Sequence, residues 1–146
     1  MTVDLYKEAG VDIAVGDSLS AFAGDICRST YNNSQFVEIL DFAQGHFRGP
    51  RGFRFKNLPA GYYLIGGADG VGTKLVIVDA AGNHHEAAYD LFAMVFDDIA
   101  RWGGLPLILV NVFDARSFGK PLTQTHGAIV NAFIGLKAVA DRIGAV

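Results

Sequence analysis

The middle of the chain carries the run Gly66-Gly67-Ala68-Asp69-Gly70-Val71-Gly72-Thr73-Lys74. Its four glycines surround one aspartate, and a threonine and a lysine follow. Glycine lets backbone N–H groups approach an anion closely, lysine can neutralise a phosphate, and an aspartate oxygen can hold Mg²⁺. The run therefore indicates a phosphate-binding loop, although a plain glycine-rich hairpin explains the spacing about as well.

This run differs from the two common phosphate motifs. We expect strands on both sides of it, over residues 62–66 and 74–78, so that Gly72-Thr73-Lys74 would enter a strand. A P-loop instead has Gly-Lys-Ser/Thr entering a helix, and the glycine spacing does not fit a dinucleotide-binding fingerprint. A phosphate site here would be of another kind.

The rest of the chain alternates between helical and extended patterns. Helices are expected from a cap at Asp17 or Ser18 to about residue 30, over 86–102, and over 123–143. Residues 6–13 look extended with a turn at Gly10, and residues 45–61 look like a long loop. The apolar run 105–113 predicts a strand buried on both faces, with Asn111 and Asp114 near its end. The mixture predicts an α/β (α+β) fold.

A second carboxylate lies in the predicted helix 86–102. At about 100° per residue, Asp98 falls on the same face as Leu91 and Val95. A carboxylate on an apolar face is costly unless it is paired or bound to a metal. Asp98 is thus either a buried cap or ion pair, or a Mg²⁺ ligand facing Asp69. Asp90, Asp97 and Arg101 form a separate polar stripe, on which Asp97 is expected to pair with Arg101.

Basic residues gather before the glycine run. Four of the 12 lysines and arginines of the chain lie within nine positions, namely Arg48, Arg51, Arg54 and Lys56. With glycines such as Gly52 between them, this segment could clasp a phosphate. A solvated loop is the more ordinary interpretation.

Composition excludes several classes of protein. The 146 residues fit one domain, and a net charge of −3 does not suggest a nucleic-acid-binding surface. No apolar run reaches the roughly 18 residues needed to cross a bilayer, and residues 1–7 lack an apolar signal core. The lone Cys27 excludes an internal disulfide and is expected to be buried. We therefore expect a cytoplasmic protein without membrane or nucleic-acid partners.

Three blocks of the sequence resemble one enzyme family, the aminoimidazole ribonucleotide synthetases (phosphoribosylformylglycinamidine cyclo-ligases). Residues 6–13, YKEAGVDI, are similar to the family's opening segment. Residues 68–75, ADGVGTKL, resemble its signature [TA]DGVGTKL. Residues 89–98, YDLFAMVFDD, followed by GLPL at 104–107, resemble its IDLVAM…ND helix and the next strand entry. The blocks occur in family order and cover nearly the whole chain.

The resemblance implies a function and a site. The family closes the imidazole ring of its nucleotide substrate with ATP and Mg²⁺. Its amino-terminal domains imply a mixed β-sheet flanked by helices, and they dimerise through strands into a β-barrel. Carried over, Asp69 and Asp98 become metal ligands. The basic cluster makes Arg51, with Gly52, the candidate for the substrate phosphate. The nucleotide-binding residues become Asp12, Asp69, Gly70, Val71, Gly72, Thr73 and Lys74. Residues 1–146 would form the single amino-terminal ATP- and metal-binding domain without the carboxy-terminal domain, inactive alone, and either a fragment of a larger chain or a stand-alone half.

Some positions depart from the family pattern and leave alternatives open. Asp97 replaces the family's asparagine, Asn111 replaces an expected aspartate, and only Gly52-Phe53 could match the family's GGFGAL loop. The chain could instead be another ATP-using member of the same superfamily. It could also be a non-catalytic dimerisation or regulatory module.

Overall fold

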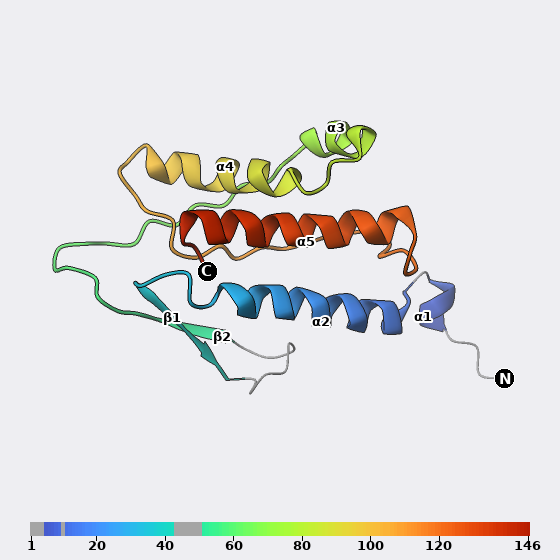
Figure 1. The fold of residues 1–146 in the computed structure, drawn as a ribbon, viewed down its shortest axis with the longest axis horizontal. Helices are drawn as coiled ribbons and strands as arrows, with labels where there is room; N and C mark the ends of the chain where they lie inside the picture. The colour runs from blue at the N-terminus through green and yellow to red at the C-terminus, as the bar shows by residue number, and fades with distance from the viewer. Residues whose placement is uncertain (1–4, 10, 43–50) are drawn as a thin grey trace.

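A computed structural model describes residues 5–9, 11–42 and 51–146 of the chain. Its elements in order are α1 (Leu5–Glu8), α2 (Ile13–Thr30), β1 (Val37–Asp41), β2 (Arg51–Phe55), α3 (Lys74–Ala81), α4 (Ala87–Ala100) and α5 (Gln124–Ile143). Helix α5 lies between α4 and α2 and contacts both, and the β1–β2 hairpin lies beside the end of α2 (Figure 1). The mixed composition confirms the broad class. The sheet of the described residues has two strands, in place of the larger helix-flanked sheet that was expected.

The three long helices were predicted correctly, with differences at their ends. Helix α2 begins earlier than expected because Asp12 caps it, its Oδ1 accepting a hydrogen bond from the Val15 N–H at 3.2 Å. Helix α5 begins after Thr123, whose hydroxyl accepts from the His126 N–H, and it ends at Gly144 with φ of 72°. No helix of the described residues has the length and hydrophobicity that crossing a membrane requires.

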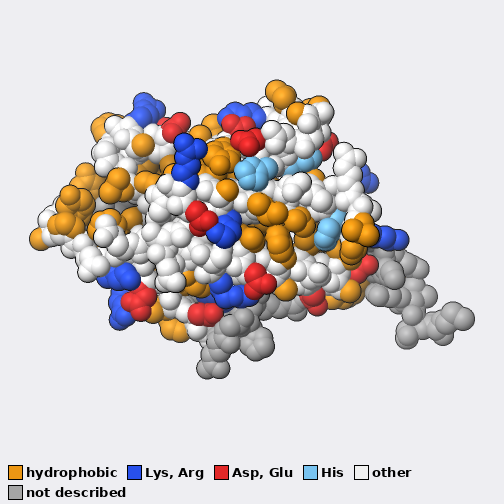
Figure 2. Space-filling model, viewed as in Figure 1, with side chains coloured by type: hydrophobic (Ala, Val, Ile, Leu, Met, Phe, Trp, Pro, Cys, Tyr) orange, Lys and Arg blue, Asp and Glu red, His pale blue; other side chains and the backbone are white. Residues whose placement is uncertain are grey.

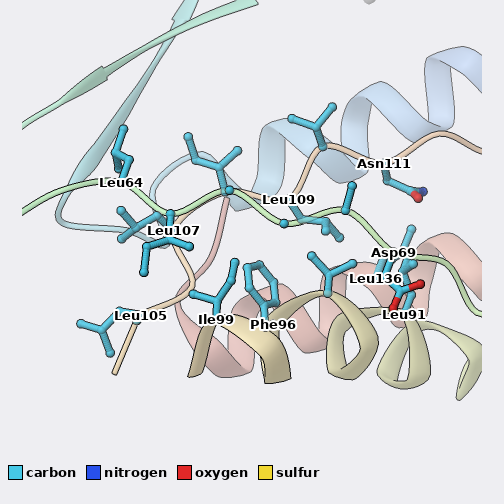
Figure 3. A pocket seen from close by; sticks show the side chains of 18 of the residues that line it. Leu64, Asp69, Leu91, Phe96, Ile99, Leu105, Leu107, Leu109, Asn111 and Leu136 are labelled. Carbon is cyan, nitrogen blue, oxygen red and sulfur yellow. The ribbon is translucent and has the colours of Figure 1, made fainter. Parts of the chain in front are cut away.

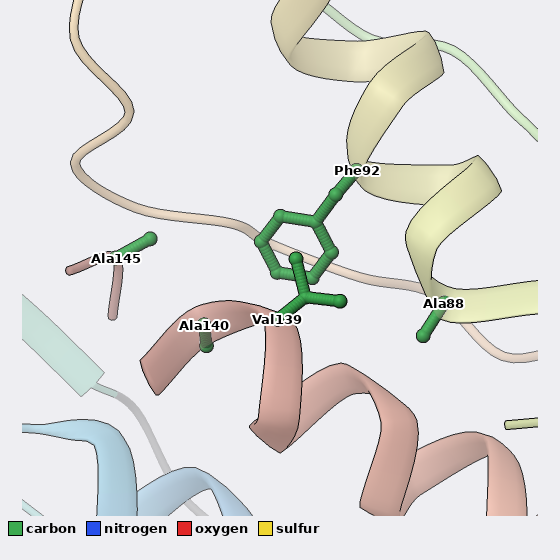
Figure 4. Close-up of a cluster of buried hydrophobic side chains, with 5 residues drawn as sticks. All are labelled: Ala88, Phe92, Val139, Ala140 and Ala145. Carbon is green, nitrogen blue, oxygen red and sulfur yellow. The ribbon is translucent and has the colours of Figure 1, made fainter. Parts of the chain in front are cut away.

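The core lies between α4 and α5. Ala88 and Phe92 of α4 pack against Val139 and Ala140 of α5, with the fully buried Ala145 beside them (Figure 4). Small side chains on both helices allow the two backbones to come close together. This packing holds α4 in place, and α4 is the helix on which the candidate site is built.

The β1–β2 hairpin was not predicted, because β2 falls in a segment interpreted as a loop. Its strands pair antiparallel, with the buried Val37 opposite Phe55 and Glu38 opposite Arg54. Arg54 Nη2 lies 2.6 Å from Glu38 Oε2, and this bond lowers the pKa of the glutamate. Residues 43–50, including Arg48, lie outside the described residues.

Several local expectations were wrong. Leu5–Glu8 is helical where an extended segment was expected, and 74–78 lies in helix α3 where a strand was expected. Residues 62–66 and 105–113 form no strand, since a strand needs a hydrogen-bonded neighbour. Among the described residues, only Val146 pairs with the second segment, through Leu109 N–H to Val146 O (2.8 Å) and Val146 N–H to Leu107 O (3.0 Å). Cys27 is exposed rather than buried.

Asp141 fastens the end of α5 to the turn before β1. Asn33 Nδ2 donates to Asp141 Oδ1 at 3.0 Å and to the Ala145 carbonyl oxygen at 3.1 Å. Lys137 also donates to the carboxylate, and its hydrogen bond, with that of Asn33, lowers the pKa of Asp141 below its ordinary value of 3.8. The charged form of Asp141 is therefore favoured in the folded chain.

The hydrogen bonds that Asp141 accepts predict that acid lowers the stability of the fold slightly. A carboxylate whose pKa is lowered by folding stabilises the fold above its unfolded pKa, and this contribution is lost as the pH falls below that value. Because Asp141 is exposed, the contribution should be under about 1 kcal/mol. Urea unfolding of the wild type and of Asp141→Asn, at pH 6 and pH 3, measures it. The wild type should lose more stability on acidification than the variant, and equal losses would contradict the prediction.

Candidate functional site

A groove of about 1290 Å³ lies along one face of α4. The segments 58–71 and 102–114 form most of its other walls, Phe53 of β2 and Leu136 of α5 also line it, and most of the lining is apolar. Figure 3 shows Leu105 and Ile99 toward one end, and Asp69 and Asn111 toward the other. A concave apolar surface with a few polar groups is typical of small-molecule sites. The polar end is therefore the candidate functional site.

The run Gly66–Lys74, here called the glycine segment, follows this groove and leads into α3. An added Cβ at Gly67 would lie 3.6 Å from Ile99 Cδ1 and from the Val95 carbonyl oxygen, so this end of the segment packs on α4. At Gly70 and Gly72, by contrast, an added Cβ would meet no atom within 4 Å. The open middle of the segment gives an anion room to approach the backbone N–H groups.

Two residues of the glycine segment carry its charge. The Asp69 side chain is exposed, and its Oδ1 accepts a hydrogen bond from the Gly70 N–H at 2.7 Å. Gly72 has φ of 62°, which favours glycine, and the chain then enters α3 at Lys74. The prediction that Gly72-Thr73-Lys74 enters a strand was thus wrong. Since lysine follows threonine here, the run still differs from a P-loop.

Asp98 does not occupy the buried position expected for it. Its side chain is 73% exposed and lies 3.2 Å from Arg101 Nη1, the partner that was predicted for Asp97. The buried stripe of α4 ends at Val95, so the last turn leaves Asp98 in solvent. Asp69 lines the groove and Asp98 does not, so their common metal site stays a prediction.

The described residues contain no group of three His, Cys, Asp or Glu side chains that could hold a metal ion. Mg²⁺ is commonly bound by one or two carboxylates together with substrate phosphates and water. The exposed carboxylate of Asp69 fits such a site, in which a nucleotide would supply the other oxygens.

The other predicted site residues have structural partners. Asp12 caps α2 and does not line the groove. Arg51 is a strand residue, 3.2 Å from both Asp41 Oδ1 and the Tyr31 hydroxyl. An added Cβ at the neighbouring Gly52 would lie 2.7 Å from the Phe42 ring. Neither residue of this pair lines the groove, so their contact with a phosphate stays a prediction.

Sequence reasoning missed the partner of Lys74. The Lys74 Nζ lies 3.6 Å from Asp90 Oδ1, in the first turn of α4, and both side chains are partly exposed. Helical periodicity placed Asp90 on the same polar stripe as Asp97, and no signal in that pattern separates the two. Only the close approach of α3 to the start of α4 distinguishes them.

Comparison with known proteins gives relatives by sequence alone. The chain is 36% identical over 129 residues to the phosphoribosylformylglycinamidine cyclo-ligase of Rippkaea orientalis, covering 88% of this chain and 35% of that protein. It is 41% identical over 109 residues to the enzyme of the same name from Synechococcus elongatus, covering 73% and 29%. The human trifunctional purine biosynthetic protein adenosine-3 is 32% identical over 119 residues, covering 82% and 11%. No family model matches the chain, and no solved structure matches it significantly.

These matches first identify a class of protein, because the relatives of the chain are named as ligases and as a purine biosynthetic protein. More particularly, it is a homologue of the phosphoribosylformylglycinamidine cyclo-ligases, as the three sequence blocks had indicated. It spans about a third of the length of the curated cyclo-ligases that it matches.

Proposed function

We propose that residues 1–146 form the amino-terminal nucleotide-binding domain of a phosphoribosylformylglycinamidine cyclo-ligase. The observation that carries the proposal is the 36% identity to such an enzyme across 88% of the chain. The groove supports it, because residues 66–71 of the glycine segment line it, with Asp69 at its polar end. The cytoplasmic location expected from the sequence is part of the same proposal.

In the complete enzyme, ATP would phosphorylate the formyl oxygen of formylglycinamidine ribonucleotide. ADP would leave, and a nitrogen of the same molecule would attack the formyl carbon and lose a proton. The bond from this carbon to the phosphorylated oxygen would break with release of phosphate, which closes the imidazole ring. The backbone N–H groups of the open glycine segment and the Lys74 ammonium would hold phosphate oxygens. Asp69, with Asp98 as the second predicted ligand, would hold Mg²⁺, which neutralises charge on the transferring phosphoryl group.

Exposed apolar side chains support the homodimer that belongs to this proposal. Tyr62 and Tyr63 are 70% and 83% exposed, and Val110 and Val112 are 83% and 79% exposed. Figure 2 shows hydrophobic side chains gathered at the end of the molecule where segment 58–66 turns beside α4. Extended segments with apolar side chains, whose backbone groups pair with no strand among the described residues, suit pairing with strands of a second copy into a barrel.

The same surface favours a second candidate function, a dimerisation module without catalysis. The two candidates share the dimer and differ in nucleotide binding. Sedimentation velocity therefore tests what they share, and calorimetry separates them.

The nucleotide proposal predicts binding of ATP with Mg²⁺ to the full-length gene product. Replacing Asp69 by asparagine should weaken this binding at least about tenfold, because it removes a charged ligand of the metal. Asp97→Asn is the matched control, since Asp97 is exposed and does not line the groove. Isothermal titration calorimetry measures the affinity of the wild type and of both variants for ATP with Mg²⁺. A dimer that binds no ATP would favour the non-catalytic module, and equal binding by Asp69→Asn would remove Asp69 from the site.

A further inference from the structure

Helix α3 is a short helix that is poorly supported by the core. None of its residues is buried, and the side chains of Val76 and Ile77 are each 72% exposed. Eight residues are too few for a stable helix in water, and β-branched residues lower helix propensity further. Contacts outside the helix must therefore help to hold it.

Two side-chain contacts, an ion pair at one end and a hydrogen bond at the other, tie α3 to the chain around the start of α4. Lys74 Nζ lies 3.6 Å from Asp90 Oδ1, at the beginning of α3. Near its end, Asp79 Oδ1 lies 3.1 Å from Nε2 of His84, in the turn before α4. The partners of α3 thus come from one short stretch of chain, and that stretch is anchored because Ala87 and Ala88 are buried.

These ties also fix the far end of the glycine segment. Gly67 packs on α4 near Val95 and Ile99, while Lys74 is held at the first turn of the same helix. Between the two anchors, Gly70 and Gly72 have no neighbouring atoms at the Cβ position. The segment therefore runs along α4 from one anchor to the other, and both anchors restrict the positions that its middle can take.

We propose that Asp90 is a positioning residue for Lys74 and the glycine segment. It holds the lysine ammonium beside the open backbone to which an anionic ligand would bind, and so this inference rests on the proposed nucleotide function. At 3.6 Å the ammonium is too far for a direct hydrogen bond to Asp90, so its three N–H donors remain for a phosphate. Asp90 therefore restricts the position of the lysine side chain without using its hydrogen-bond donors.

Asp90 also has an opposing effect, because its negative charge repels a phosphate. Both side chains are partly exposed, so solvent and salt screen this repulsion. A phosphate bound on the far side of the ammonium would lie farther from Asp90 than the 3.6 Å that separates Asp90 from Lys74, and charge interactions weaken with distance. We therefore expect positioning to outweigh repulsion.

Hydrogen exchange tests the positioning without any ligand. In the full-length gene product, Asp90→Asn should make the amides of residues 70–81 exchange about two- to fivefold faster, the range for breaking a surface ion pair. Asp97→Asn, a neutralisation on the same polar stripe of α4, should leave them unchanged. The exchanged pair Lys74→Asp with Asp90→Lys should restore slow exchange. Wild-type exchange rates in Asp90→Asn would overturn the inference.

Ligand binding tests whether the ordered lysine serves a phosphate. Asp90→Asn should weaken ATP binding with Mg²⁺ about two- to fivefold and leave adenosine binding unchanged, since adenosine has no phosphate. The exchanged pair should restore slow exchange but not ATP affinity, because the ammonium has left the segment. Tighter ATP binding by Asp90→Asn would overturn the inference. If the wild type binds no ATP at all, the proposed function fails, and hydrogen exchange alone then decides on the positioning by Asp90.

Discussion

Replacing Phe92 by alanine is expected to lower the free energy of unfolding by about 3–5 kcal/mol. Phe92 is only 5% exposed and reaches from α4 into the cluster formed with α5 (Figure 4). Its neighbours Ala88, Val139, Ala140 and Ala145 are small, so their side chains cannot move into the space left by the ring. The cavity should persist, and its cost adds to the lost burial of the ring.

Urea unfolding measures this loss, with Phe53→Ala as the matched control. Phe53 lies on β2 and is 51% exposed, so truncation there should cost clearly less. A domain of this size is stabilised by about 5–15 kcal/mol, and Phe92→Ala removes a large fraction of that. Similar losses in the two variants would show that the α4–α5 cluster is not the centre of stability.

The helices could be predicted because their signals are local. Apolar side chains recur at helical spacing in α2, α4 and α5, and residues such as Thr123 and Gly144 mark the ends of α5. The helix-or-strand choice failed for α3, a short apolar run in which periodicity does not distinguish the two. The missed hairpin did carry a signal, since Phe53 and Phe55 alternate with polar residues in β2.

The expected strand over 105–113 failed for a different reason. Its apolar composition is typical of a strand buried on both faces, but Leu105 and Val110 are 67% and 83% exposed. Burial of such a run needs neighbouring strands, and a sequence pattern does not say which chain supplies them. A second copy is the proposed source.

The candidate site could be predicted where it depends on a continuous segment. The glycines, Asp69 and Lys74 are adjacent in sequence, so their backbone chemistry follows from residue type. The exposure of Asp98 depends instead on how far along α4 the packing of other segments extends, and no residue of α4 specifies that extent. The Lys74–Asp90 pair likewise depends on the turn between α3 and α4.

Two glycines of α5 should respond to alanine with opposite signs. An added Cβ at Gly135 would lie 2.2 Å from the His85 carbonyl oxygen and 3.0 Å from Ala88 Cβ, where α5 crosses α4. At Gly127 it would meet no atom within 4 Å. Alanine in a helix is favoured over glycine by up to about 1 kcal/mol, so Gly127→Ala should stabilise the fold by up to that amount.

Gly135→Ala gains the same helix propensity but must push α4 away from α5. The atom in its way is a backbone oxygen, which cannot rotate aside as the end of a long side chain can. Overpacking of this kind costs about 1–3 kcal/mol, so the net change should be destabilising. Urea unfolding of both variants gives the two signs. Because Ala88 and Phe92 lie on the helix that would be displaced, Gly135→Ala should also increase hydrogen exchange in α4. If both variants are more stable than the wild type, the two helices do not meet at Gly135.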